Sequence, residues 1–122
     1  MIFAGCQQKQ QWNGGAINKP GYYEFHSEIN ISVNERNNLI EYSVESKDGS
    51  LTIPRKSFSA LHNWAFYLEN DGTLWVFSSD MGHSVWKRNS QGIFKETAFD
   101  HYLSREEIPK HIYNSLADYF ER

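Results

Sequence analysis

NWAFYLENDGTLWVFSS, residues 63–79, carries a strong hairpin signal. Two apolar runs stand on either side of Asn70-Asp71-Gly72, and Asp-Gly in that position favours a tight turn, because the turn needs a positive φ that Gly adopts without strain. Both faces of the predicted hairpin carry large apolar side chains, since Tyr67, Trp75 and Phe77 oppose Trp64, Phe66, Leu68, Leu74 and Val76. One face therefore meets the core, and the other needs cover from the C-terminal helix or from a partner.

Further strands are predicted before and after this hairpin. In YYEFHSEINISV (22–33), apolar and polar residues alternate with the period of two that a half-buried strand requires, and LIEYSVES (39–46) continues the pattern. LTI (51–53) predicts a short strand that Pro54 ends or moves to an edge. HSVWKR (83–88) and IFKET (93–97) follow turn signals downstream. The spacing predicts an antiparallel meander.

The C-terminal stretch SREEIPKHIYNSLADYFER (104–122) has a different period. Its apolar residues recur every four positions, at Ile108, Ile112, Leu116 and Phe120, which is one stripe on a helix. Ser104 and Glu107 match a capping box at its start. We therefore expect an α+β fold: an antiparallel β-meander of about six or seven short strands, with a C-terminal helix packed on the sheet.

Length, charge and cysteine content limit the possible classes. The chain has 122 residues, which fits one domain, and a net charge of -3, which argues against a phosphate-binding surface and hence against nucleic acid as a partner. No stretch reaches the length of a membrane-spanning helix. The single cysteine, Cys6, cannot form an internal disulfide.

No residue pattern predicts catalysis, a metal or a cofactor. The five histidines lack the short spacing of zinc sites. Ser, Asp and His occur together in SSDMGHS (78–84), but they lie on one predicted turn, where Ser and Asp bond local backbone groups, rather than on separate segments that converge. Glu24, His26 and Glu28 share one face of a strand, which is typical of a solvated face. We expect no catalytic residues and no enzyme activity.

The excess of aromatic residues supplies the candidate binding residues. If Trp75, Phe77 or Trp86 is left exposed, it becomes an anchor for a protein interface, where Trp and Tyr are enriched in hot spots. Asp80 and His83, in the neighbouring turn, complete this predicted partner-binding set.

Phe3-Ala4-Gly5-Cys6 resembles the lipobox of bacterial lipoproteins, in which an apolar residue, two small residues and a cysteine mark the end of a signal peptide. Only five residues precede Cys6, so the chain resembles a lipoprotein whose start was trimmed or misplaced. The resemblance implies that Cys6 carries a lipid and that QQKQQWNGG (7–15) is a tether. It also implies a periplasmic protein anchored to the outer membrane, because Gln7 is not Asp. The alternative is a free cysteine near a disordered N-terminus.

Together these patterns predict residues 1–20 as the remnant of a signal peptide plus a flexible tether, and residues 21–122 as a single globular β-rich domain with a C-terminal helix. Two functions remain open. The first is a non-catalytic envelope lipoprotein that binds another protein, for instance an immunity or inhibitor protein against a periplasmic toxin, with membrane contact only through a lipid on Cys6. The second is a module that binds or cleaves cell-wall glycan or peptide through exposed aromatic residues.

Overall fold

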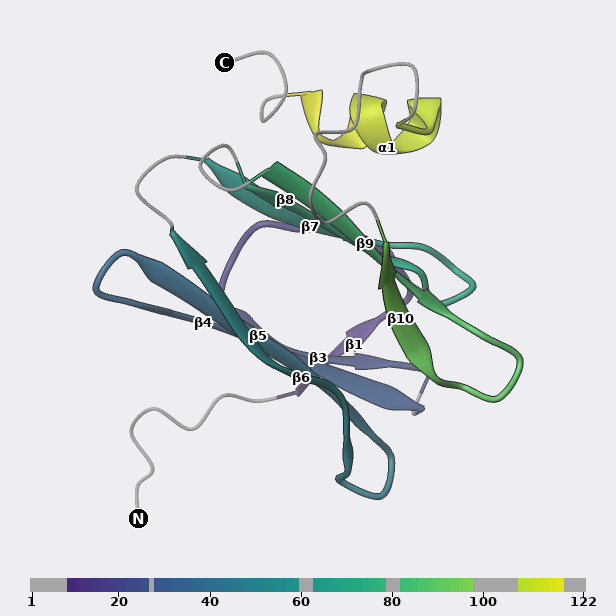
Figure 1. Cartoon of the computed structure of the whole chain (residues 1–122). Coiled ribbons are helices and arrows are strands. Elements are labelled where there is room, and N and C mark those ends of the chain that lie inside the picture. Colours follow the sequence, from purple (N-terminus) through teal and green to yellow (C-terminus); the bar gives the residue numbers. More distant parts are fainter. Residues whose placement is uncertain (1–8, 27, 60–62, 79–81, 98–107, 118–122) are drawn as a thin grey trace.

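Two five-stranded sheets face each other, and a short helix lies over one of them (Figure 1). The structure is a computed structural model that describes residues 9–26, 28–59, 63–78, 82–97 and 108–117. The described part is thus built in three layers, sheet, sheet and helix. We call the two sheets A and B.

Sheet A is a four-strand antiparallel meander with one extra edge strand. Its order is β1-β3-β4-β5-β6, and β1 runs parallel to β3, while the other pairs are antiparallel. The strands are β1 (Lys9–Trp12), β3 (Gly21–Phe25), β4 (Ile29–Arg36), β5 (Leu39–Ser46) and β6 (Leu51–Ser59). Pro54 lies in β6, at the sheet's edge, as the sequence predicts, although the strand continues through it to Ser59.

Sheet B is antiparallel throughout, in the order β10-β9-β8-β7-β2. Its strands are β2 (Gly15–Ile17), β7 (Trp64–Leu68), β8 (Leu74–Ser78), β9 (Gly82–Arg88) and β10 (Phe94–Thr97). The hairpin of β7 and β8 forms as predicted: Leu68 pairs with Leu74, and Gly72 has a φ of 91°.

The prediction of an α+β meander with a packed helix is wrong. The chain is mostly β, with two sheets instead of one, and α1 (Lys110–Ser115) has only six residues. Two successive meanders each present an apolar inner face, so they bury those faces against each other instead of sharing one sheet. Pro109 is the N-cap of α1, and the predicted capping box of Ser104 and Glu107 lies outside the described residues.

The flexible tether expected within residues 1–20 is wrong for the described part of that stretch. β1 joins sheet A and β2 joins sheet B, so residues 9–17 link the two sheets. Trp12 packs edge-on against Tyr23, with ring centroids 4.9 Å apart, and Ile17 is 1% exposed. β1 and β2 are only four and three residues long and contain just three apolar residues, Trp12, Ala16 and Ile17, so their polar composition concealed both strands.

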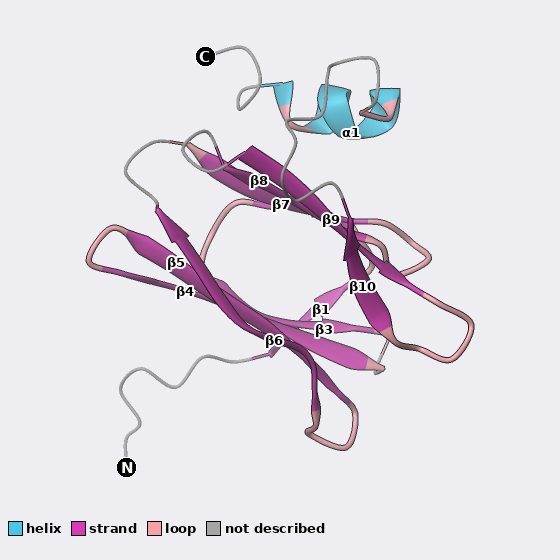
Figure 2. Ribbon diagram, in the orientation of Figure 1, coloured by secondary structure: helices cyan, strands magenta, loops and turns pink. Residues whose placement is uncertain are grey.

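Two apolar clusters hold the layers together. The larger fills the space between the sheets and takes residues from both, among them Phe25, Ile31, Tyr42, Phe66 and Trp86. The smaller lies on the outer face of sheet B, under α1, and consists of Ala65, Trp75, Phe77, Val85, Ile108, Ile112 and Leu116 (Figure 2). Sheet B is therefore apolar on both faces, while the outer face of sheet A has no such cluster in the described residues.

Candidate functional site

The three aromatic residues predicted as partner anchors are buried. Trp75 is 7% exposed, Phe77 0% and Trp86 6%. Trp75 and Phe77 lie in the cluster under α1, whereas Trp86 lies between the sheets and donates from Nε1 to the hydroxyl of Tyr42 at 3.1 Å. The exposure that would make them partner anchors is absent, because the fold itself covers them.

The other predicted site residues are spread over different places. His83 is half-buried, with its ring edge-on to Phe77 at 4.9 Å, and burial lowers the pKa of its imidazole. Asp80 and Cys6 lie outside the described residues. The predicted residues therefore do not form one site in the part of the chain that the structure describes.

The outer face of sheet A carries a candidate site that the sequence interpretation missed. Successive residues of a strand point to opposite faces, and the odd-numbered residues Ile31 and Val33 of β4 are fully buried in the core. The outward residues fall in register across the strands: Tyr22 pairs with Ser32 and Ser32 with Ser43, while Asn34 pairs with Glu41 and Glu41 with Ser57.

The tight turn between β4 and β5 fixes this register. Asn37 and Asn38 both have positive φ, 54° and 64°, as a two-residue hairpin turn requires, and Asn adopts this conformation more readily than other residues with side chains. Arg36 therefore pairs with Leu39. The same register places Glu41 directly across from Asn34.

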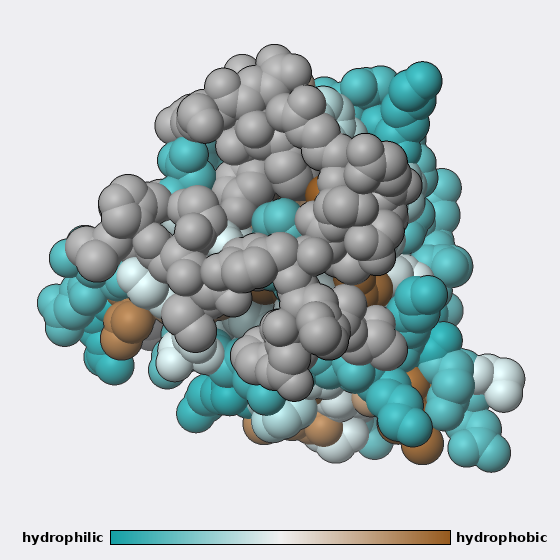
Figure 3. All heavy atoms as spheres, turned by 45° about the horizontal axis from the view of Figure 1, so that its top comes forward, coloured by the Kyte–Doolittle hydropathy of each residue, from teal (hydrophilic) through white to brown (hydrophobic). Residues whose placement is uncertain are grey.

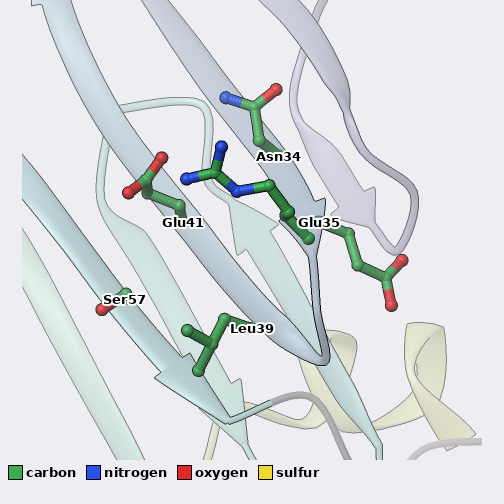
Figure 4. A pocket seen from close by; sticks show the side chains of 6 residues that line it. Asn34, Glu35, Leu39, Glu41 and Ser57 are labelled. Carbon is green, nitrogen blue, oxygen red and sulfur yellow. The ribbon is translucent and has the colours of Figure 1, made fainter.

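Two adjoining hollows lie on this face. The first, of about 370 Å³, is lined by Asn34, Glu35, Arg36, Leu39, Glu41 and Ser57 (Figure 4). The second, of about 260 Å³, is lined by Tyr22, Ser32, Asn34, Glu41, Tyr42, Ser43, Glu45, Leu51 and Arg55. Asn34 and Glu41 line both. Ser32 and Ser43 have small side chains, which leaves space between the larger side chains that line the second hollow. The pairing of β5 with β6 is irregular beside them, between Tyr42 and Glu45.

Two exposed leucines stand on the same face. Leu39 is 48% exposed and lines the first hollow, and Leu51 is 50% exposed and lines the second. The only other large hydrophobic residue exposed in the described part of the chain is Ile93, at 57%, in the turn between β9 and β10. Apolar exposure in the described residues is thus concentrated on the outer face of sheet A.

Charged groups surround the leucines. The hydroxyl of Tyr22 donates to Oε1 of Glu45 at 3.0 Å, and burial, followed by this hydrogen bond, raises the pKa of Tyr22. The side chains of Glu41, Arg36 and Arg55 form no ion pair or hydrogen bond with any residue that the structure describes. These three charges are available to a partner.

A further hollow, of about 480 Å³, lies at one end of sheet B. It is lined by Asn13, Gly14, Gly15, Tyr67, Leu68, Glu69, Asn70, Asp71 and His111. Its carboxylates already have internal roles: Glu69 accepts from Trp75 Nε1 at 2.7 Å and contacts His111 Nε2 at 3.2 Å. Asp71 accepts from the backbone N–H of Thr73 at 2.9 Å, and this bond lowers its pKa.

The described residues contain neither a metal-binding cluster nor a membrane-spanning helix. No group of three or more His, Cys, Asp or Glu side chains in the described ranges could hold a metal ion. No helix in those ranges is long and apolar enough to cross a membrane. The side that carries α1 shows apolar atoms only as separate patches among hydrophilic ones, where its atoms are described (Figure 3).

One sequence signal could have found the outer face of sheet A. Leu39 alternates in step with Glu41, Ser43 and Glu45, so it is an apolar residue on the polar side of a predicted strand.

Comparison of the chain with protein-family models, with curated proteins and with solved structures found no match.

Proposed function

We propose that this chain is a non-catalytic domain that binds another protein, and that the partner docks on the outer face of sheet A. The observation that carries the proposal is the exposure of Leu39 and Leu51 on one face, beside two hollows. Burying a leucine side chain contributes about 1.5 to 3 kcal/mol, so covering both would supply a substantial part of a binding free energy.

The surroundings of the two leucines support a protein partner. Protein interfaces combine a few apolar anchors with a polar rim that supplies directional hydrogen bonds. Here Glu41, Arg36 and Arg55 stand around the leucines without internal partners in the described chain. Such charges give specificity and raise the rate of association.

The cell-wall glycan alternative depends on exposed aromatic platforms. Of the four tryptophans, Trp75 and Trp86 are 7% and 6% exposed, and Trp12 and Trp64 are half-buried and pack against the core. Tyr22 is the one aromatic side chain directed outward that lines the second hollow, and it is half-buried with its hydroxyl engaged by Glu45. We therefore prefer the protein binder.

The proposed location rests on Phe3-Ala4-Gly5-Cys6 alone. We propose that a lipid on Cys6 anchors the protein in the periplasm, at the outer membrane, where the partner is a secreted toxin or an envelope protein. Labelling of producing cells with radioactive palmitate tests the anchor. Label in the wild-type protein and none in Cys6→Ser is the expected result, and equal labelling of both excludes Cys6 as the lipidation site.

The docking surface is tested by capture from envelope extract with three variants of the full chain. Leu39→Glu and Leu51→Glu place a charge at the proposed contacts, and Ile93→Glu is the matched control, because Ile93 is at least as exposed but lies on a turn of sheet B. We expect the wild type and Ile93→Glu each to capture one protein in a near-stoichiometric amount. Leu39→Glu and Leu51→Glu should capture at least about tenfold less of that protein. Binding to purified peptidoglycan, with no protein captured, would overturn the proposal.

A further inference from the structure

Glu41 stands on the boundary between the two hollows of sheet A. It lines both of them, it is exposed, and its carboxylate has no hydrogen bond or ion pair with any described residue. Figure 4 shows its carboxylate on the same side of the sheet as Asn34, whereas Glu35 points away from both. Glu41 is thus positioned to contact a molecule in either hollow.

Ser43 supplies an independent observation in the second hollow. It lies two residues after Glu41 on the same face of β5, it is 8% exposed, and it lines that hollow. Its hydroxyl makes no hydrogen bond to any residue that the structure describes and keeps access to the hollow, so a bound group can reach it. The hydroxyl of the neighbouring Ser32, by contrast, accepts from the Asn34 amide at 3.5 Å.

The charges of this face indicate the kind of group that would satisfy Ser43 and Glu41. The second hollow is lined by two carboxylates, of Glu41 and Glu45, and by one guanidinium group, of Arg55. The hydroxyl proton of Tyr22 is already donated to Glu45. The second hollow therefore presents mainly hydrogen-bond acceptors and a negative excess, so a cationic donor is complementary to it.

We propose that an arginine side chain of the partner enters the second hollow, with its guanidinium between Glu41 and Glu45 and an N–H donated to the hydroxyl of Ser43. These three residues alternate along one face of β5. At about 3.3 Å per residue, the Cα atoms of Glu41 and Glu45 are roughly 13 Å apart. A guanidinium has five N–H donors in a planar fork and can bond a carboxylate and a hydroxyl at once, which a compact ammonium does less well. Apolar residues beside that arginine cover Leu51, which pairs with Glu45 and lines the same hollow. This inference rests on the proposed function.

The test is a titration of the isotopically labelled full chain with capped tripeptides, followed by the amide resonances. The probe is acetyl-Leu-Arg-Leu-amide, and the comparison peptides have Lys, Gln or Glu in the centre. We expect millimolar arginine peptide to shift the resonances of residues 41–45 and 32, with weaker shifts for lysine and none for glutamine or glutamate. Salt should weaken the binding, because the contact is between exposed charges.

Two variants locate the contact. Glu41→Gln should weaken the arginine peptide about tenfold, the loss of one charge-assisted hydrogen bond. Glu28→Gln removes the same charge from an exposed position that lines neither hollow, and should leave the affinity within about twofold. Absence of shifts at millimolar peptide, equal shifts with the glutamate peptide, or equal effects of both variants would overturn the inference. If partner capture is still lost in Leu39→Glu, the docking surface stands and only its preference for arginine fails.

Discussion

A buried hydrogen bond, accepted by the hydroxyl of Tyr42, joins the two sheets. Tyr42 lies on β5 of sheet A and accepts a hydrogen bond from Nε1 of Trp86, on β9 of sheet B, at 3.1 Å. Nζ of Lys56, on β6, lies over the ring of the same tryptophan, 5.6 Å from the ring centroid. The same Nζ is 3.9 Å from Oε1 of Glu96, on β10. Polar contacts at this edge of the sandwich thus position the sheets relative to each other.

Tyr42→Phe should destabilise the protein by about 1 to 3 kcal/mol, because the indole N–H of Trp86 keeps its burial and loses its acceptor. Urea unfolding measures the change. Tyr22→Phe is the control, since its hydroxyl bonds Glu45 at the surface, and its effect should stay within about 0.5 kcal/mol. Equal losses in the two variants would contradict the role of the buried hydrogen bond.

Stability should also fall in alkali. Burial, the largest cause, raises the pKa of Tyr42 to about 12, so the folded state holds the phenolic proton more tightly than the unfolded state does. The resulting stabilisation is complete below the unfolded pKa of about 10 and is lost as the pH rises towards 12, by roughly 3 kcal/mol. Unfolding measured between pH 9 and pH 12 should show this decline, and the decline should be smaller in Tyr42→Phe than in the wild type.

The burial of the predicted anchors depends on contacts with distant parts of the chain. The sequence shows that Trp75, Phe77 and Trp86 are large and lie on strands, but exposure depends on what packs over each face. Trp75 and Phe77 meet Ile112 and Leu116 of the C-terminal region, and Trp86 meets Tyr42, 44 residues away in the chain. No local pattern contains those contacts.

At the element scale, the N-terminal strands differ most from the sequence interpretation. The hairpin of β7 and β8 was predictable because its turn and its apolar runs are contiguous. β1 pairs with β3 in parallel and β2 pairs with β7, about 50 residues later, so their pairing leaves no local signature. The short turn at Gly14 connects β1 to β2.

Gly14→Ala should cost about 2 kcal/mol or more. Gly14 has a φ of 105°, and a Cβ there would lie 3.0 Å from the carbonyl oxygen of Leu68 and 3.1 Å from Oδ1 of Asn70. Gly49 has a similar φ of 90° with no atom within 4 Å, so Gly49→Ala carries only the backbone cost of about 1 to 2 kcal/mol. Chemical denaturation of both variants should place Gly14→Ala below Gly49→Ala, and the reverse order would argue that residues 9–17 contribute little to the fold.

The packing of α1 gives another test at this scale. Ile112 is fully buried among Trp75 and Phe77, so Ile112→Ala should cost about 2 to 5 kcal/mol and increase the exposure of Trp75. Thermal unfolding followed by tryptophan fluorescence measures both changes. Lys110→Ala, at an exposed position of the same helix, is the control. An unchanged unfolding midpoint in Ile112→Ala would mean that α1 does not stabilise sheet B.

At the scale of the whole molecule, the two sheets differ in what covers them. The outer face of sheet B is covered by α1, while sheet A presents Leu39, Leu51 and unpaired charges on its outer face. Composition predicted a β-rich domain without a basic surface, but it could not divide the strands between two sheets. The structure places β6 in sheet A and β7 in sheet B, and this division determines which face remains for a partner.

The most direct measurement is photo-cross-linking in cells that produce the full-length protein. A benzoylphenylalanine at Ser57, which is exposed and lines the first hollow, reports contact with the outer face of sheet A. The same group at Gln91, in the exposed turn between β9 and β10, is the control. We expect one discrete cross-linked product from position 57, lost when Leu39→Glu is added, and none from position 91. A product from position 91 alone, or equal products from both positions, would contradict docking on sheet A.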